Sequence, residues 1–262
     1  MIPSTITGTN TGTTRVAVVT GANKGIGFAI ARQLAELGMT VHLGARDEER
    51  GRAAEAELCA AGLDVRFVHL DVTDEATVAL AAKQVEEVSG RLDVLVNNAG
   101  TSSPWKPPSQ TSTDEVRSAL ETNVLGVVTV TNAMLPLLRR SEAGRIVNLS
   151  STFGSLTAAA ENRDPGNFFP PGAFPVILDY PASKAALNAV TLMYANELRE
   201  SGILVNAVCP GYVATDRSHG HGALTPEQGA LVPVRLATLR DGGPTGTFTG
   251  SDGTPNGLPL PW

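Results

Sequence analysis

Tyr180 and Lys184, in the segment "YPASK", are residue types that could carry acid–base chemistry. Residues four apart on a helix share one face, so both side chains can reach the same small volume, and Pro181 is tolerated in a first turn. An ammonium group beside a phenol favours the phenolate, which suits a proton donor working near neutral pH. The same spacing is common on ordinary helix surfaces, so a catalytic role also requires other residues that could act on the same substrate. Ser150 and Ser151, which end "RIVNLSS", offer a hydroxyl that could hydrogen-bond a substrate carbonyl oxygen.

A glycine-rich segment, "TGANKGIG", lies between an apolar run and a helix-like stretch. Strand, glycine turn and helix in this order build an anion cradle, because the free N–H groups and the dipole of a helix N-terminus favour a phosphate. The spacing G-x-x-x-G-x-G is a variant of the dinucleotide-binding fingerprint. A glycine-rich turn without a ligand is the alternative. The residues expected to form the cradle are Gly21, Asn23, Lys24, Gly25, Ile26 and Gly27.

The segment "LGARDEERG" ends the second apolar run, where a dinucleotide fold meets the adenosine ribose. Arg46 can bind a 2'-phosphate through its planar set of donors, and Lys24 can add a second positive charge. The two residues together therefore favour NADP(H). Two solvated surface cations are the alternative interpretation, and the neighbouring Asp47 could serve a free 2'-hydroxyl instead.

Two further polar turns follow apolar runs. In "LDVTD", Asp71 and Val72 are placed to meet the edge and the face of an adenine. In "NNAG", the turn of Asn98, Ala99 and Gly100 lets the backbone approach a ribose. Either segment could also be an ordinary loop that binds no ligand.

Short apolar strands alternate with amphipathic helices along the chain, and this alternation must position the residues above. The expected strands are 16–19, 41–44, 65–70, 94–96, 146–149 and 204–208, and the expected helices are 28–37, 53–62, 75–88, 114–138 and 182–201. A further helix start is indicated at Thr225, Pro226 and Gln228 by a cap, a proline and a capping-box partner. Such alternation predicts a parallel sheet with helices on both faces, the doubly wound α/β (Rossmann) class. Ligands bind at the carboxyl ends of its strands, where every motif above lies.

No linker, internal repeat or shift in composition divides the chain. We therefore expect residues 15–262 to form a single domain, with an insertion at about 158–178. Residues 1–14, rich in threonine and glycine, are expected to be a disordered tail.

Composition narrows the partners of the protein. The 262 residues carry a formal net charge of -6 and no run of Lys or Arg, so binding to nucleic acid is not expected. Cys59 and Cys209 are too few for a disulfide framework or a metal cluster, and His219 and His221 have no third ligand nearby, so no metal is expected. The sequence has no apolar stretch of about 18 residues and no signal-like N-terminus, which favours a cytoplasmic protein without a membrane anchor.

Five segments, taken in order, carry a family resemblance: "TGANKGIG", "NNAG", "RIVNLSS", "YPASK" and "CPGYVATD". Together they resemble the short-chain dehydrogenase/reductase family from about Arg15 to near the C-terminus. Within it, "ARDEERG", "LDVLVNNAG" and "TPEQGA" are similar to segments of the carbonyl reductases.

The resemblance implies a catalytic role for each of four residues. Tyr180 would be the general acid/base, Lys184 would tune it and bind the nicotinamide ribose, and Ser151 would polarise the carbonyl. Asn123, in "ETNVLG", matches the family asparagine that holds a water in the proton relay. The remaining matches are Val213 and Thr215, which would orient the carboxamide of the cofactor.

The stretch between Ser151 and Tyr180 is longer than in most members of this family. It is either a surface loop stiffened by prolines or a wall of the substrate pocket, and monomeric carbonyl reductases also carry an insertion here. The pocket residues expected on the second interpretation are Phe168, Phe169, Phe174 and Tyr212. A loop that covers the helix of Tyr180 and Lys184 would favour a monomer, although a dimer or tetramer is possible.

The function expected from these residues is NADPH-dependent, reversible reduction of a small-molecule ketone, aldehyde or quinone to an alcohol. Two alternatives use the same fold. One is a non-catalytic dinucleotide-binding redox sensor, and the other is a nucleotide-sugar epimerase or dehydratase. A sensor has no need for Ser151, Tyr180, Lys184 and Asn123 together, and the glycine spacing and length disfavour the epimerase.

Overall fold

The computed structural model describes residues 14–166, 170 and 172–262. The strands are β1 (Val16–Thr20), β2 (Thr40–Ala45), β3 (Val65–His69), β4 (Val94–Asn97), β5 (Arg145–Leu149), β6 (Leu204–Cys209), β7 (Phe248–Gly250) and β8 (Leu258–Pro259). The α-helices are α1 (Gly25–Glu36), α2 (Glu48–Ala60), α3 (Glu75–Ser89), α4 (Thr113–Leu120), α5 (Gly126–Leu138), α6 (Leu156–Glu161), α7 (Asp179–Glu197) and α8 (Pro226–Ala237).

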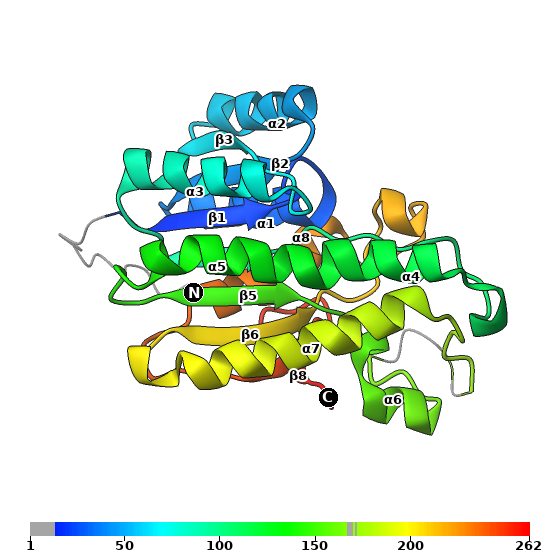
Figure 1. Ribbon diagram of the computed structural model, residues 1–262. Helices are drawn as coiled ribbons and strands as arrows, with labels where there is room; N and C mark the ends of the chain where they lie inside the picture. The colour runs from blue at the N-terminus through cyan, green and yellow to red at the C-terminus, as the bar shows by residue number, and fades with distance from the viewer. Residues whose placement is uncertain (1–13, 167–169, 171) are drawn as a thin grey trace, which may run out of the picture.

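The described strands form one eight-stranded sheet in the order β3-β2-β1-β4-β5-β6-β7-β8. Neighbours pair in parallel from β3 to β7, and only the short β8 runs antiparallel to its neighbour β7. The chain winds outward from β1 through β2 to β3 and then crosses back to β4 on the other side of β1 (Figure 1). This reversal leaves a crevice between the carboxyl ends of β1 and β4, where open α/β sheets bind their ligands.

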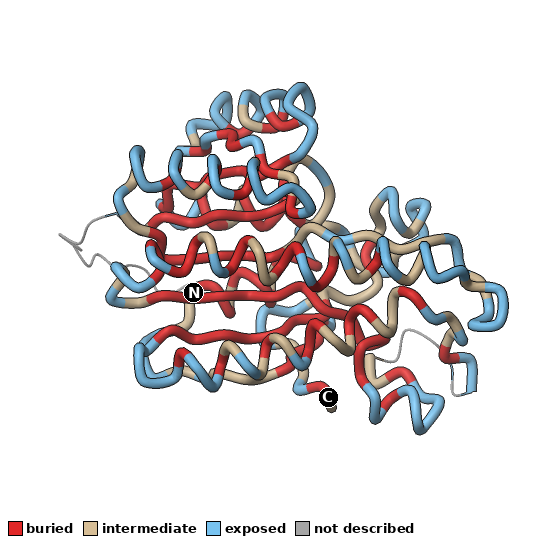
Figure 2. Tube along the Cα trace, viewed as in Figure 1, coloured by how far each residue is buried: buried red, intermediate tan, exposed pale blue. Residues whose placement is uncertain are grey.

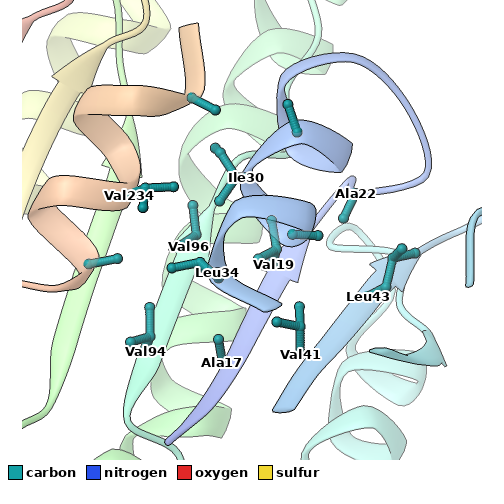
Figure 3. Close-up of a cluster of buried hydrophobic side chains, with 14 of the residues drawn as sticks. Ala17, Val19, Ala22, Ile30, Leu34, Val41, Leu43, Val94, Val96 and Val234 are labelled. Atoms are coloured by element: carbon teal, nitrogen blue, oxygen red, sulfur yellow. The ribbon is translucent and has the colours of Figure 1, made fainter. Parts of the chain in front are cut away.

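Helices cover both faces of the sheet, and each face has its own apolar core. On one face, α1 and α8 pack on the strands through side chains such as Ile30, Leu34 and Val234, which Figure 3 shows converging with Val19 and Val96. On the other face, α3, α5 and α7 lie across the sheet (Figure 1) over a second cluster that includes Met134 and Leu138. Burying each large apolar side chain stabilises the fold by about 1.5–3 kcal/mol.

Figure 2 shows strands that are buried along their length between helices whose outer faces are exposed. β1, β2, β5 and β6 are fully buried, as expected for parallel strands covered on both sides. The predicted doubly wound α/β class is therefore confirmed. The tail predicted for residues 1–14 lies, except for Thr14, outside the described residues.

The structure departs from the predicted elements at the edge of the sheet and in the helix predicted over 114–138. β7 and β8 were not predicted, because strands of three and two residues carry no recognisable periodicity. The helix predicted over 114–138 is interrupted by a π-helical turn, η2 (Glu121–Leu125), between α4 and α5. The helix start predicted at Thr225 is present, since Thr225 and Gln228 form a capping box at the N-terminus of α8.

Candidate active site

A cavity of about 800 Å³ lies at the carboxyl ends of the central strands and gathers most of the predicted site residues. Those among its lining residues that the sequence predicts are Gly21, Asn23, Lys24, Gly25, Ile26, Gly27, Arg46, Asp71, Val72, Asn98, Ala99, Gly100, Tyr180, Lys184 and Thr215. The cavity joins the turns after β1, β2, β3 and β4 to the N-terminal part of α7 and the segment after β6. A volume of this size is within the range of cofactor sites.

The three glycines of the turn after β1 are required by backbone conformation or by close packing. Gly21 and Gly25 adopt positive φ angles of 63° and 57°, which glycine reaches without strain. A Cβ on Gly27 would lie 2.4 Å from the Asn98 Nδ2 atom and 2.5 Å from the Gly21 carbonyl oxygen. Lys24, the N-cap of α1, makes no side-chain hydrogen bond to the first turn, so the helix N-terminus is free to receive an anion from the cavity.

The turns after β1 and β4 are held together by Thr20 and Asn98. The Thr20 hydroxyl accepts hydrogen bonds from the backbone N–H groups of Asn98 and Ala99, both at 3.0 Å. The Asn98 side chain donates to the carbonyl oxygens of Thr20 and Gly21 at 2.8 and 3.0 Å. This reciprocal set fixes the crevice at the point where the strand order reverses.

Arg46 and Lys24 line the end of the cavity where the sequence predicts the adenosine of a dinucleotide, the adenosine end. The exposed Lys24 ammonium pairs at 2.6 Å with Asp216, a residue of the segment after β6 that also lines the cavity. Asp47, which the sequence offered as a partner for a ribose hydroxyl, instead caps α2 by accepting a hydrogen bond from the Arg50 N–H at 3.0 Å. Asp47 is not among the residues that line the cavity, whereas its neighbour Arg46 is.

Tyr180 and Lys184 lie on the first turns of α7, at the opposite end of the cavity. The Lys184 ammonium donates to the Leu149 carbonyl oxygen at 2.7 Å and lies 5.6 Å from the centre of the Tyr180 ring. Burial, with added repulsion from the Arg217 guanidinium, lowers the pKa of Lys184 to about 7. An ammonium fixed beside the phenol in this way favours the phenolate.

Asn123 is fully buried in the π-helical turn η2 and does not line the cavity. Its amide nitrogen donates to the Thr101 carbonyl oxygen and to the Ser183 hydroxyl, both at 2.9 Å, and its oxygen accepts from the Thr101 N–H at 2.8 Å. Ser183 in turn donates to the Tyr180 carbonyl oxygen at 2.8 Å. Asn123 therefore ties the loop after β4 to the first turn of α7, and π-helical turns are frequent at functional sites.

The two serines after β5 have different surroundings. Ser150 lines the cavity, but its hydroxyl donates to the Asn188 side chain at 2.6 Å. Ser151 is the N-cap of the 3-10 helix η3 (Thr152–Gly154), where its hydroxyl accepts from the Phe153 N–H at 3.3 Å. Ser151 is not among the lining residues, so its predicted contact with a substrate stays a prediction.

Three other predicted residues also lie outside the lining of this cavity: Val213, Tyr212 and Phe174. Phe174 is buried and packs edge-on against Phe153 at 5.1 Å between ring centres, and Phe153 packs against Tyr180 at 6.2 Å. The segment before α7 thus touches the candidate catalytic tyrosine through an intervening ring. Phe168 and Phe169 lie outside the described residues.

Several lining residues were not predicted, and two of them carry charge: Asp216 and Arg217. They directly follow Thr215. Asp216 is the last residue of the motif "CPGYVATD", which could have pointed to it, and Arg217 is the next residue after the motif. The polar residues Thr101, Ser102, Ser118 and Thr122 also line the cavity. They come from the loop after β4 and from α4 and η2, and their approach depends on tertiary packing.

The described residues provide neither a metal-binding cluster nor a helix that could span a membrane. In the described part of the chain there is no group of three or more His, Cys, Asp or Glu side chains placed to hold a metal ion. No helix among those residues has the length and apolar character needed to span a bilayer.

A Rossmann sheet with an anion cradle after β1 and a Tyr–Lys pair on α7 defines a dinucleotide-binding protein of the oxidoreductase kind. The family model of the short chain dehydrogenases matches residues 15–162 and 172–223, and the chain belongs to this family. It is 36% identical to the (-)-isopiperitenone reductase of Mentha piperita, over 89% of this chain and 95% of that protein.

Two carbonyl reductases are also similar to this chain. The NADPH carbonyl reductase 1 of Sus scrofa is 36% identical, over 90% of this chain and 91% of that protein. The crystal structure of NADPH-bound carbonyl reductase from chicken fatty liver matches with a TM-score of 0.80 at 27% identity, over 95% of this chain and 99% of that one. The predicted resemblance to carbonyl reductases is therefore confirmed.

Proposed function

We propose that this protein is an NADP(H)-dependent oxidoreductase that reversibly reduces a ketone, aldehyde or quinone carbonyl to an alcohol. One observation carries the proposal: a single cavity joins a phosphate cradle and Arg46 at one end to Tyr180 and Lys184 at the other. A redox sensor would need the first end only. The relatives named as NADPH carbonyl reductases support the same activity.

The residues at the adenosine end fit NADP(H). Gly27 lets the turn after β1 pack closely on Asn98, because a Cβ there would clash with the Asn98 side chain. The N-terminus of α1 faces the cavity, and Arg46 and Lys24 supply positive charge for a 2'-phosphate. Asp47, the carboxylate that would have suited a free 2'-hydroxyl, is engaged as a helix cap. When bound, the cofactor supplies the hydride, and the protein supplies orientation and a proton.

The proposed roles at the other end follow from the contacts of each side chain. Tyr180 gives a proton to the substrate oxygen as charge develops there, and Lys184 favours the resulting phenolate. Ser151 donates its hydroxyl proton to the carbonyl oxygen, and that proton is available because the Ser151 oxygen only accepts in its contact with the Phe153 N–H. Asn123 holds α7 and the loop after β4 at a fixed spacing.

We also propose that residues 15–262 act as one domain on a small-molecule substrate. The continuous sheet from β3 to β8 supports this interpretation. The contact of Phe174 with Phe153 supports packing of Phe174 on its own subunit, as a monomer would need.

Purified protein should oxidise NADPH when given members of a panel of ketones, aldehydes and quinones, as followed by NADPH absorbance. Binding of NADPH without turnover of any carbonyl would favour the redox sensor instead. Equal efficiency with NADPH and NADH would contradict the assignment of Arg46 and Lys24 to a 2'-phosphate.

A further inference from the structure

A third cation, Arg217, lies beside Tyr180 at the chemistry end of the cavity. It belongs to the 3-10 helix η5 (Asp216–Ser218), which follows β6. Its guanidinium carbon lies 4.4 Å from the centre of the Tyr180 ring. A Cβ placed on Gly100 would lie 3.8 Å from the Arg217 Nη1 atom and 3.7 Å from the Lys184 Nζ atom, so both cations face the same wall.

The position of Arg217 is supported by a loop that is anchored on both sides. Arg217 Nε donates to the Ser102 hydroxyl at 3.3 Å. Asn123 bonds both backbone groups of Thr101, and the buried Asp179 carboxylate accepts from the Ser103 N–H at 2.9 Å. The residues on either side of Ser102 are therefore fixed, and Ser102 presents a defined acceptor to the guanidinium.

The charge of Arg217 is not neutralised within the described part of the chain. Arg217 makes no ion pair with any described carboxylate, and the adjacent Asp216 is paired with Lys24 at 2.6 Å. The guanidinium lies over the Tyr180 ring, which is a favourable cation–π contact, and its hydrogen bond to Ser102 uses only Nε. The terminal N–H groups at its edge remain available for a planar acceptor, and a guanidinium binds a carboxylate through two parallel hydrogen bonds.

We propose that Arg217 is a specificity-determining residue that binds an anionic group, a carboxylate above all, on the carbonyl substrate. The inference rests on the proposed reductase activity. A carboxylated substrate would be oriented with its carbonyl toward Tyr180, whereas a neutral analogue would leave the cation without a partner. The pyrophosphate of the dinucleotide is the other anion that could reach Arg217, and the experiment must separate the two.

The test uses 4-carboxybenzaldehyde and its methyl ester, which differ in charge and share the same aldehyde. Wild-type protein, Arg217→Gln and Arg217→Lys are compared by kcat/KM for both aldehydes and by NADPH affinity from fluorescence. Arg139→Gln is the matched control, because Arg139 is an exposed arginine on the last turn of α5 that pairs with Glu197. We expect Arg217→Gln to lower kcat/KM for the carboxylate about 10- to 100-fold more than for the ester, because the contacts of Arg217 with Tyr180 and Lys184 affect both substrates alike and only the carboxylate loses an ionic partner. Arg217→Lys should recover part of the loss.

Equal losses for both aldehydes, or no loss for the carboxylate, would overturn the inference. Weaker NADPH binding by Arg217→Gln would assign the cation to the cofactor and would also overturn it. If neither aldehyde is reduced, calorimetric titration of 4-carboxybenzaldehyde into the NADP-loaded protein tests anion binding independently of the reductase activity. Binding that is lost in Arg217→Gln would support the inference while the proposed reductase activity fails, and absent binding would reject both.

Discussion

The two ends of the cavity are built in different ways. At the adenosine end, the backbone of the glycine turn provides the surface, and the exposed side chains Arg46 and Lys24 provide the charge. At the chemistry end, Lys184 is 3% exposed and Asn123 is fully buried, and both are held by hydrogen bonds to other elements. Exposed charges can be exchanged one at a time with small effects on folding, whereas buried polar groups depend on each other because each must keep its partner.

The largest effect is expected at the chemistry end, from Tyr180→Phe. Loss of the proton donor should lower kcat by about 100- to 10,000-fold, while NADPH affinity should remain within about threefold of the wild-type value. Steady-state kinetics and fluorescence titration measure the two quantities. Tyr194→Phe, on the same helix with its hydroxyl bonded to Asn132, is the matched control and should keep normal turnover. Wild-type kcat in Tyr180→Phe would remove Tyr180 from the mechanism.

Lys184 gives the chemistry end a cost in stability that depends on pH. Burial and the Arg217 cation lower the pKa of Lys184 to about 7, so the folded protein releases a proton that the unfolded chain keeps to about pH 10. Between these values the unfolded state binds more protons, and wild-type stability therefore rises with pH by at most about 1.4 kcal/mol per unit.

Lys184→Met lacks this titration and should be inactive but more stable than wild type near neutral pH. Its advantage in free energy of unfolding should shrink between about pH 7 and about pH 9, as measured by urea titration. Lys83→Met removes an exposed lysine that is paired with Glu87. Its free energy of unfolding should change with pH in parallel with that of the wild type. Parallel curves for Lys184→Met would show that Lys184 keeps its proton throughout this range.

The adenosine end was the part of the site that sequence could predict best. Its residues lie in short turns next to predicted strands, so the six predicted residues of the glycine turn, Arg46 and Asp71 all line the cavity as local patterns suggested. Parallel strands that are buried on both faces carry continuous apolar runs, and for this reason the central strands of the sheet could also be predicted from the sequence.

At the chemistry end, the spacing of Tyr180 and Lys184 was a local pattern, and both residues line the cavity. The rest of this end depends on contacts between distant segments, which no local pattern records. Arg217 meets Tyr180 only because the segment after β6 folds over α7, and Ser102 meets Arg217 only because Asn123 and Asp179 anchor its neighbours. The π-helical turn that carries Asn123 has no sequence signal within the helix predicted over 114–138.

A smaller effect is expected at the adenosine end from Arg46→Ala. Loss of one exposed guanidinium should weaken NADPH binding by about tenfold and leave NADH within about twofold, because only NADPH carries the 2'-phosphate. Fluorescence titration with each cofactor measures this difference. Arg52→Ala is the control, since Arg52 pairs with Glu48 on α2 and is not among the residues lining the cavity. Equal weakening of NADH would mean that Arg46 supports the fold of the turn.

The smallest effect is expected from Asp216→Asn. This substitution tests whether Asp216 competes with the 2'-phosphate of NADPH for the Lys24 ammonium. Lys24 and Asp216 pair at 2.6 Å while their side chains are 58% and 79% exposed, and the hydrogen bond from Lys24 lowers the pKa of Asp216. Exposed pairs of this kind contribute little, so freeing Lys24 should tighten NADPH binding by only about two- to fivefold, and less at high salt.

The competition requires Lys24, so the matched background is Lys24→Met. In that background Asp216→Asn should have no further effect on NADPH affinity, because the ammonium that Asp216 holds is gone. NADH affinity should not change in either background. A gain that persists without Lys24 would place Asp216 itself near the phosphate as a repulsive charge, and a loss of affinity in Asp216→Asn would show that the pair orients Lys24 toward the cofactor.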